Sequence, residues 1–449
     1  MDKKKYKKLQ KRREYKKFKR KKKNFHGNVF LKEQKFKKKI DSIKIDKFQS
    51  ELYEFLKRKK FVEDSNKVSN HIKIPKKFSL YENYNSTLKI IELFTSSISK
   101  LEFKELVIDF SNCIQVDQPA LFLFQVIWKE FNEEIKKLKY ALIYKNDFTN
   151  INVISSKKSS VNKLLFVAGF IKQTNVKDEK LKPVNTIGYF KGIKSQKNYT
   201  ENRKSLIAGK LVGYINSCLK EIGFAFSEKG TNYFDGLISE ILNNAEDHSP
   251  MNTYYVTANF MREFDSMKIK NDEIGELNLS ILNFGDSYYE GLIDTKSKNI
   301  EIMHQMEQLY NKVNIKENTV FNKENLFTLY ALQDGMSRLK FEDESRGTGT
   351  MAFINSFFLL GDYENHFKNY YPSLKIFTGN TFLKCDNTFK PFEIDGVNFL
   401  SLNSNNDLST KPENSHLINN DKYFPGTILH IKIYLNNNHI LNKIDEENN

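Results

Sequence analysis

Residues 240–248 read Glu-Ile-Leu-Asn-Asn-Ala-Glu-Asp-His, within a segment whose apolar residues recur with helical spacing. On a helix, Glu240, Asn244 and His248 lie one turn apart on a single face. A glutamate can act as a base toward water, and an amide oxygen is a ligand that Mg²⁺ accepts when phosphates and waters complete its shell. An ordinary amphipathic helix with a polar stripe would have the same pattern. The downstream sequence is therefore needed to distinguish a functional site from such a helix.

Two strands are expected after this helix. Thr253–Phe260 is rich in β-branched and aromatic residues. Leu277–Leu282 is an alternating strand that runs directly into Asn283-Phe284-Gly285-Asp286. A glycine at a strand exit lets the backbone approach a ligand closely or adopt a positive φ. The exit of the second strand is therefore a candidate for contact with a ligand.

A glycine-containing segment precedes the next predicted helix. A long polar stretch, residues 286–345, leads to Arg346-Gly347-Thr348-Gly349-Thr350 and then to an apolar helix at Met351–Leu360. Two glycines just before a helix present unblocked N–H groups at the positive end of the helix dipole. This arrangement suits a phosphate, although a lone Gly-x-Gly is also an ordinary way to enter a helix.

The order of these elements resembles the ATP-binding domain shared by histidine kinases, Hsp90, gyrase B, MutL and anti-sigma serine kinases, the GHKL superfamily. The end of the region is similar too, with expected strands at Leu374–Thr378 and Thr427–Leu435, the latter introduced by Phe424-Pro425-Gly426. The resemblance covers about residues 201–437. It implies an α/β fold, an α+β two-layer sandwich with a mixed sheet, that binds ATP and Mg²⁺.

The resemblance also implies roles for individual residues. Glu240 would be the base that orients or deprotonates the nucleophile attacking the γ-phosphate, and Asn244 would ligate Mg²⁺. Residues 286–345 would form a mobile lid, and His248 would be a packing or helix-end residue rather than a catalyst. The remaining residues that it assigns to the nucleotide are Asn283, Gly285, Arg338, Arg346, Gly347, Thr348, Gly349, Thr350 and Thr427.

One position departs from the family pattern. The first glycine box of the family usually begins with an aspartate, whose carboxylate accepts a hydrogen bond from the adenine amino group, whereas this chain has Asn283 there. Ser287 stands where the second glycine of that box is usual. An asparagine oxygen can still accept the bond, but the amide adds a donor and carries no charge. The adenine contact is therefore changed, while the metal and phosphate residues of the pattern are present.

Upstream, residues 46–175 alternate predicted strands and helices. Strands are expected at Glu105–Phe110 and Tyr140–Tyr144, and helices at Gln118–Leu138 and Ser159–Phe170. This order predicts a small α/β layer domain.

The same region resembles the sulphate-transporter and anti-sigma-antagonist (STAS) domain, through Val107-Ile-Asp-Phe, Val116-Asp117 and a helix that closes at Gly169-Phe170. Regulatory members of that family carry a phosphorylated serine or threonine just after the aspartate. Here Asp117 is followed by Gln118-Pro119-Ala120, with no hydroxyl at the matching position. The resemblance therefore implies a docking or dimerisation module, and a purely structural domain is the alternative.

The remaining segments are polar. Residues 176–200 are expected to be a linker and residues 438–449 a C-terminal tail. Residues 1–40 hold 20 of the 72 lysines and arginines but only 3 of the 55 acids, so the formal net charge of +17 lies in the tail 1–45 and the rest is balanced. We expect this tail to be disordered, either binding nucleic acid or another polyanion or simply keeping the chain soluble.

Cysteine spacing and hydropathy indicate the cellular compartment. Cys113, Cys218 and Cys385 are widely spaced and form neither a disulfide framework nor a zinc motif. No apolar stretch approaches the ~20 residues that span a bilayer, and the basic N-terminus lacks the apolar run of a signal peptide. These features predict a soluble, cytoplasmic protein.

Two classes of function remain open. The chain is either an ATPase or anti-sigma-type serine/threonine kinase of bacterial regulation, or a nucleotide-gated interaction protein with little turnover that binds a protein partner through its N-terminal domain and tail. A histidine kinase is not indicated, because neither His26 nor His71 is followed by the acid that accompanies a phosphoacceptor histidine.

Overall fold

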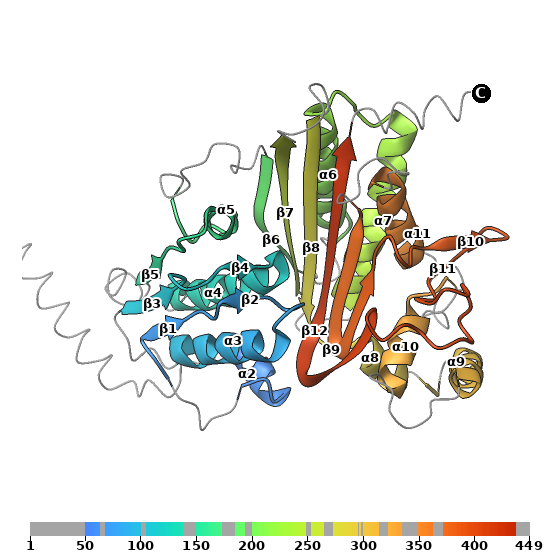
Figure 1. Ribbon diagram of the computed structural model, residues 1–449, viewed down its shortest axis with the longest axis horizontal. Helices are drawn as coiled ribbons and strands as arrows, with labels where there is room; N and C mark the ends of the chain where they lie inside the picture. Colours follow the sequence, from blue (N-terminus) through green and yellow to red (C-terminus); the bar gives the residue numbers. More distant parts are fainter. Residues whose placement is uncertain are drawn as a thin grey trace, which may run out of the picture.

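The computed structural model describes most of the chain between residues 50 and 436 as a mixed α/β protein (Figure 1). No helix in that described part is long and apolar enough to cross a membrane. The predicted tails 1–45 and 438–449 lie outside it. The described residues are 50–62, 68–99, 105–137, 150–172, 185–193, 200–247, 253–264, 273–294, 296–297, 300–313, 322–334, 349–361 and 371–436.

A five-stranded sheet forms the centre of the structure. Every pair of neighbouring strands in it is antiparallel, so the expectation of a mixed sheet is wrong. The reason lies in β12, which runs against both of its neighbours. In spatial order the strands are β6 (Asn185–Ile193), β7 (Thr253–Phe264), β8 (Glu273–Phe284), β12 (Leu417–Asn436) and β9 (Ser373–Cys385).

Three helices cover one face of this sheet, namely α6 (Thr200–Lys220), α7 (Glu228–Asp247) and α11 (Gly349–Gly361) (Figure 1). The α7 helix begins at Ser227, whose hydroxyl accepts a hydrogen bond from the Gly230 N–H. Its buried apolar residues recur every three or four positions, so one side of the helix faces the core. They are Phe234, Leu237, Ile238, Ile241, Leu242 and Ala245.

The other face of the sheet is covered by α3 (Tyr84–Ser99) and α4 (Gln118–Lys137) of the N-terminal region. Successive side chains of a strand point to opposite faces, so adjacent residues enter different cores. Ile281 belongs to the core under α7, whereas Leu282 belongs to the core under α3 and α4. Burial on both faces also includes polar residues of these strands, such as Asn278 and Ser280.

The N-terminal region contains a parallel three-stranded sheet in the order β1 (His71–Lys73), β3 (Glu105–Asp109) and β5 (Asn150–Ile154). The predicted first strand and the helices α4 and α5 (Ser159–Val167) are confirmed, while the predicted strand 140–144 lies outside the described residues. The N-terminal region also contains α2 (Glu51–Arg58) and the short parallel pair β2 (Lys77–Phe78) and β4 (Gln115–Val116).

Part of the predicted linker is a strand instead. Within residues 176–200, β6 pairs with β7 at the edge of the large sheet, so the sheet begins upstream of residue 201. Gly192 makes this pairing possible, because a Cβ at that position would lie 2.0 Å from the ring of Tyr254. Lys191 adds an ion pair of 2.7 Å to the buried Glu130 of α4.

The segment 286–345 was expected to be a mobile lid, and its described part is instead largely a set of packed helices. These are α8 (Tyr288–Asp294), α9 (Ile300–Val313) and α10 (Lys323–Ala331). Leu326, Phe327 and Leu329 of α10 have no exposed surface, so this helix belongs to the core. Its apolar residues, which alternate with polar ones in the sequence, are buried where α10 packs against α8, α9, β9 and β12.

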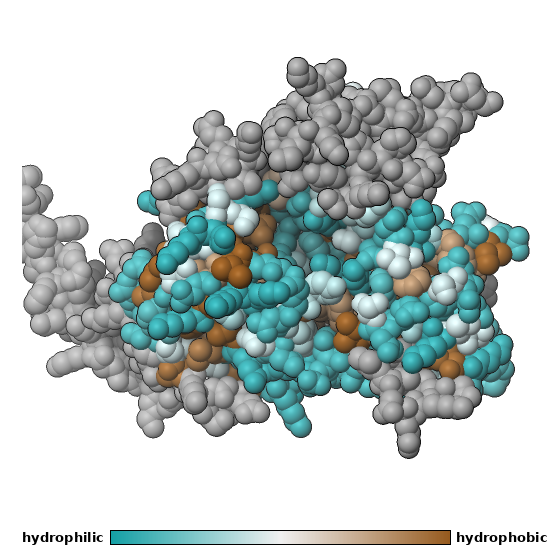
Figure 2. All heavy atoms as spheres, viewed as in Figure 1, coloured by the Kyte–Doolittle hydropathy of each residue, from teal (hydrophilic) through white to brown (hydrophobic). Residues whose placement is uncertain are grey.

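A short antiparallel hairpin, β10 (Phe392–Ile394) and β11 (Val397–Phe399), projects from the large-sheet half of the molecule (Figure 1). Over the described surface seen in Figure 2, polar residues predominate and apolar ones form small separate groups.

Candidate functional site

The helix α7 meets the first turn of α11 at the predicted site. The Asn244 side-chain amide donates a hydrogen bond of 3.3 Å to the hydroxyl of Thr350. Tyr233 and Ser356, further along the two helices, are joined by a second hydrogen bond of 2.9 Å. The structure therefore brings the Glu-x-x-x-Asn helix and the end of the Gly-x-Gly-Thr segment together, although 105 residues separate them in the sequence.

The exit of β8 lies beside the bend in β12. Thr427 is the register partner of Asn283, and Gly426 is the partner of Phe284. Gly426 has a φ of +146°, and a Cβ there would stand 2.1 Å from the Asn283 carbonyl oxygen. Gly285 donates its N–H to the Pro425 carbonyl over 3.3 Å. Gly285 after β8 and Gly426 at the bend within β12 thus permit a very close backbone approach.

A cavity opens between α7 and the sheet at this point. The space between its lining atoms, open solvent included, is about 370 Å³. Its walls are mainly apolar, and none of the described lining residues is charged. They are Ile241, Asn244, Ala245, Ile281, Asn283, Tyr288, Thr427 and Leu429. Asn244, Asn283 and Thr427, three residues predicted for the nucleotide, therefore line one cavity.

The Asn283 side chain is 3% exposed and lines this cavity. Its amide nitrogen has no hydrogen-bond partner among the described residues. A buried polar group without a partner is unfavourable by about 1–3 kcal/mol, so such a group in a cavity wall favours a ligand that completes its bonding.

Two threonine hydroxyls stand behind Asn283. The Thr427 and Thr378 oxygens lie 2.9 Å apart, and the Thr378 hydroxyl also accepts a hydrogen bond of 3.2 Å from the Tyr288 N–H. Burial raises the pKa of the Tyr288 phenol to about 12, so its ring lines the cavity as a neutral group. This chain of contacts fixes Thr427 against the cavity.

The other predicted residues are not all brought to the cavity. Glu240 lies one turn before Asn244 on α7 but is not among the residues that line the cavity. Gly285, which directly follows β8, does not line the cavity either. Gly349 is the first residue of α11. The residues Arg338, Arg346, Gly347, Thr348 and His248 lie outside the described part of the chain.

Few of the described residues that line the cavity could act as ligands to a metal ion. No group of three or more His, Cys, Asp or Glu side chains that could hold an ion occurs among the described residues. Because the Asn244 nitrogen donates to Thr350, its oxygen is left as the ligand atom, which fits an ion that takes most of its shell from phosphates and water.

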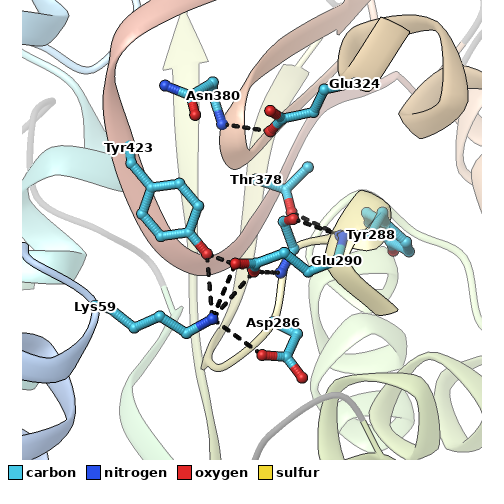
Figure 3. Close-up of polar contacts among 9 residues, drawn as sticks. Lys59, Asp286, Tyr288, Glu290, Glu324, Thr378, Asn380 and Tyr423 are labelled. Carbon is cyan, nitrogen blue, oxygen red and sulfur yellow. Dashed lines mark hydrogen bonds and ion pairs between the residues drawn. The ribbon is translucent and has the colours of Figure 1, made fainter. Parts of the chain in front are cut away.

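A polar cluster next to the cavity was not predicted. Figure 3 shows the Lys59 ammonium directed at Asp286 and Glu290, which it contacts at 3.0 and 3.1 Å. Tyr423 donates its hydroxyl to Glu290. Lys59 ends α2, far from these residues in the sequence, so no local pattern could have indicated the contact.

Glu324 belongs to the same region and accepts a hydrogen bond of 2.8 Å from the Asn380 N–H (Figure 3). Burial raises the pKa of its carboxyl, and the nearby Glu290 carboxylate acts in the same direction.

A scan against protein-family models, a search of curated proteins and a search of solved structures gave no match to this chain. The chemistry of the cavity therefore rests on the residues that line it.

Proposed function

We propose that residues 185–436 form a GHKL-type ATP-binding domain that binds Mg²⁺-ATP in the cavity between α7 and the sheet. The observation that supports this most directly is the meeting of Asn244, Asn283 and Thr427 in one cavity. These residues come from three segments of the chain, and the sequence resemblance assigns all three to the nucleotide.

The proposed binding mode follows from the chemistry of the walls. Ile241, Ile281 and Leu429 would hold the planar base, and Asn283 would contact its polar edge. The phosphates would extend toward the first turn of α11, where the Asn244 oxygen would bind Mg²⁺.

We propose phosphoryl transfer as the reaction of this site, either to water or to a serine or threonine of another protein. Glu240 would be the base, one helical turn from the metal ligand Asn244. The N-terminal region would be a STAS-like module, consistent with the parallel order β1-β3-β5 and with α4 following β4.

A nucleotide-gated interaction protein is the second candidate, and one observation favours it. Lys59 of the N-terminal region contacts Asp286 and Glu290, which directly follow the strand exit at Asn283. A conformational change at the cavity on nucleotide binding would thus be transmitted to the N-terminal module, and this role requires little nucleotide hydrolysis.

The test uses the full chain with [γ-³²P]ATP and Mg²⁺, measuring bound nucleotide, released phosphate and labelled protein. Asn244→Ala is expected to lose Mg²⁺-dependent binding, and Asn243→Ala, a neighbour outside the cavity lining, is expected to keep it. Equal binding by both variants would contradict the site.

Glu240→Ala separates the two functions. It is expected to bind ATP and to lose phosphate release and protein labelling by about 10²-fold or more if the chain is an enzyme. If the wild-type chain binds ATP but shows neither release nor labelling, alone or with cell lysate, the interaction protein is the better description.

A further inference from the structure

The base-contacting end of the cavity presents a neutral carboxamide. Asn283 is 3% exposed, its amide nitrogen is without a partner among the described residues, and the described walls around it carry no charge. A buried and unpartnered polar group on a residue that lines a cavity is a feature that a ligand completes. The identity of that ligand therefore depends on what a carboxamide can pair with.

An asparagine differs from an aspartate in having two complementary edges. The carboxamide oxygen accepts hydrogen bonds and the nitrogen donates them, whereas both oxygens of a carboxylate only accept. No hydrogen bond from another described residue holds the Asn283 amide in one orientation. Turning the amide by half a rotation exchanges donor and acceptor without breaking a contact within the described structure.

The two orientations match the two purine bases. Adenine presents an amino donor beside the N1 acceptor, and guanine presents the O6 acceptor beside the N1–H donor. With the oxygen toward the amino group the carboxamide pairs with adenine, and with the nitrogen toward O6 it pairs with guanine. A carboxylate at the same place would pair with the adenine amino group and would face the guanine O6 with a second negative atom.

We propose that this cavity accepts both adenine and guanine nucleotides, and that Asn283 is the residue that makes it permissive. This inference rests on the proposed nucleotide site and goes beyond it by assigning the substrate class. The apolar walls act equally on either purine ring, so they add affinity without choosing between the bases.

The experiment measures the dissociation constants of ADP, GDP and inosine diphosphate on the full chain with Mg²⁺ by calorimetry. Inosine diphosphate presents the same O6 and N1–H edge as guanine without the 2-amino group, so it isolates the contact to Asn283. We expect all three constants to agree within about tenfold in the wild-type chain. This ratio needs no variant, so a folding defect cannot obscure it.

Asn283→Asp then tests the residue. We expect this variant to bind ADP with a dissociation constant within about tenfold of the wild-type value. We expect its dissociation constants for GDP and inosine diphosphate to rise by at least about 30-fold, because a carboxylate cannot donate a hydrogen bond to O6. Asn311→Asp makes the same chemical change on the exposed face of α9 and is expected to leave all three constants unchanged.

The outcomes distinguish this inference from the proposed function. If the wild-type chain binds ADP but binds GDP and inosine diphosphate more than about 100-fold more weakly, the nucleotide site stands and the permissive base contact is wrong. An Asn283→Asp variant that still binds the three nucleotides equally would also overturn the role of Asn283. If none of the three binds, the nucleotide site itself is wrong.

Discussion

The ammonium of Lys59 lies 3.0 Å from the Asp286 carboxylate, although 227 positions separate the two residues in the chain. Lys59 is the C-cap residue of α2, and Asp286 follows the strand exit that carries Asn283. Their side chains are 22% and 33% exposed, so the pair is partly shielded from water. The N-terminal region is thereby fixed directly to the loop that adjoins the cavity.

Lys59→Met tests this connection by removing the charge and keeping most of the side-chain volume. We expect the unfolding free energy to fall by about 1 kcal/mol, because Asp286 and Glu290 lose their shared cation in a partly exposed site. We also expect the ATP dissociation constant to rise severalfold, since the loop after Asn283 loses an anchor. Denaturant titration and calorimetry measure the two effects. Arg58→Met, on an exposed neighbour, is the matched control, and equal effects of both variants would argue against the connection.

The same cluster predicts a dependence of stability on pH. Burial by itself would raise the pKa of Glu290, but hydrogen bonds from Tyr423, Ser287 and Lys59 bring it below the ordinary value of 4.5. A depressed pKa in the folded state adds stability that is present above pH 4.5 and lost as the pH falls through the folded value. We expect Glu290→Gln to flatten this loss in urea titrations between about pH 7 and about pH 3.

The control for that series is Glu393→Gln, on the exposed hairpin strand β10, which should retain the wild-type slope of unfolding free energy against pH. A Glu290→Gln variant with an unchanged slope would show that this carboxylate is not linked to folding.

Gly426→Ala tests the close approach of β12 to the end of β8. The added Cβ would meet the Asn283 carbonyl at 2.1 Å, at a φ of +146° that alanine rarely adopts. We expect the unfolding free energy to fall by about 3 kcal/mol and nucleotide affinity to fall with it, because Asn283 must move.

Gly396→Ala provides the matched control. Gly396 also has a positive φ, of +78°, but a Cβ there meets nothing within 4 Å. We expect the unfolding free energy to fall by about 1 kcal/mol from backbone strain alone, and nucleotide affinity to stay unchanged. If the two alanine variants behave alike, contact with Asn283 is not the reason for the glycine at 426.

Asn325→Ala tests whether α10 is part of the core. Asn325 shares a capping box with Asn322, and its buried amide donates a hydrogen bond of 2.8 Å to Thr381 of β9. We expect a loss of about 2 kcal/mol in unfolding free energy, since a cap and a buried hydrogen bond disappear together. Asn311→Ala, exposed on α9, should change it by less than about 0.5 kcal/mol. Equal values would indicate that α10 is only loosely held.

Much of the secondary structure could be predicted because its causes are local. The spacing of Phe234, Ile238, Ile241 and Ala245 depends only on the helical period, and it predicted α7 correctly. The alternation of apolar and polar residues over 277–282 likewise predicted the core of β8. Strand β6 was missed because its nine residues include two glycines and a lysine and show little alternation.

The sequence by itself determined that Asn244 stands on a helix and that Asn283 lies at the exit of a strand, because each depends on neighbouring residues. It predicted that Gly426 introduces a strand, whereas β12 begins at Leu417 and Gly426 lies at an irregularity within it. Only the tertiary structure decided that Asn244, Asn283 and Thr427 share a cavity. It also decided that the N-terminal helices cover the second face of the sheet, with Lys59 reaching Asp286. The physical reason is that strand register and the burial of both sheet faces join segments hundreds of residues apart, which no local periodicity encodes.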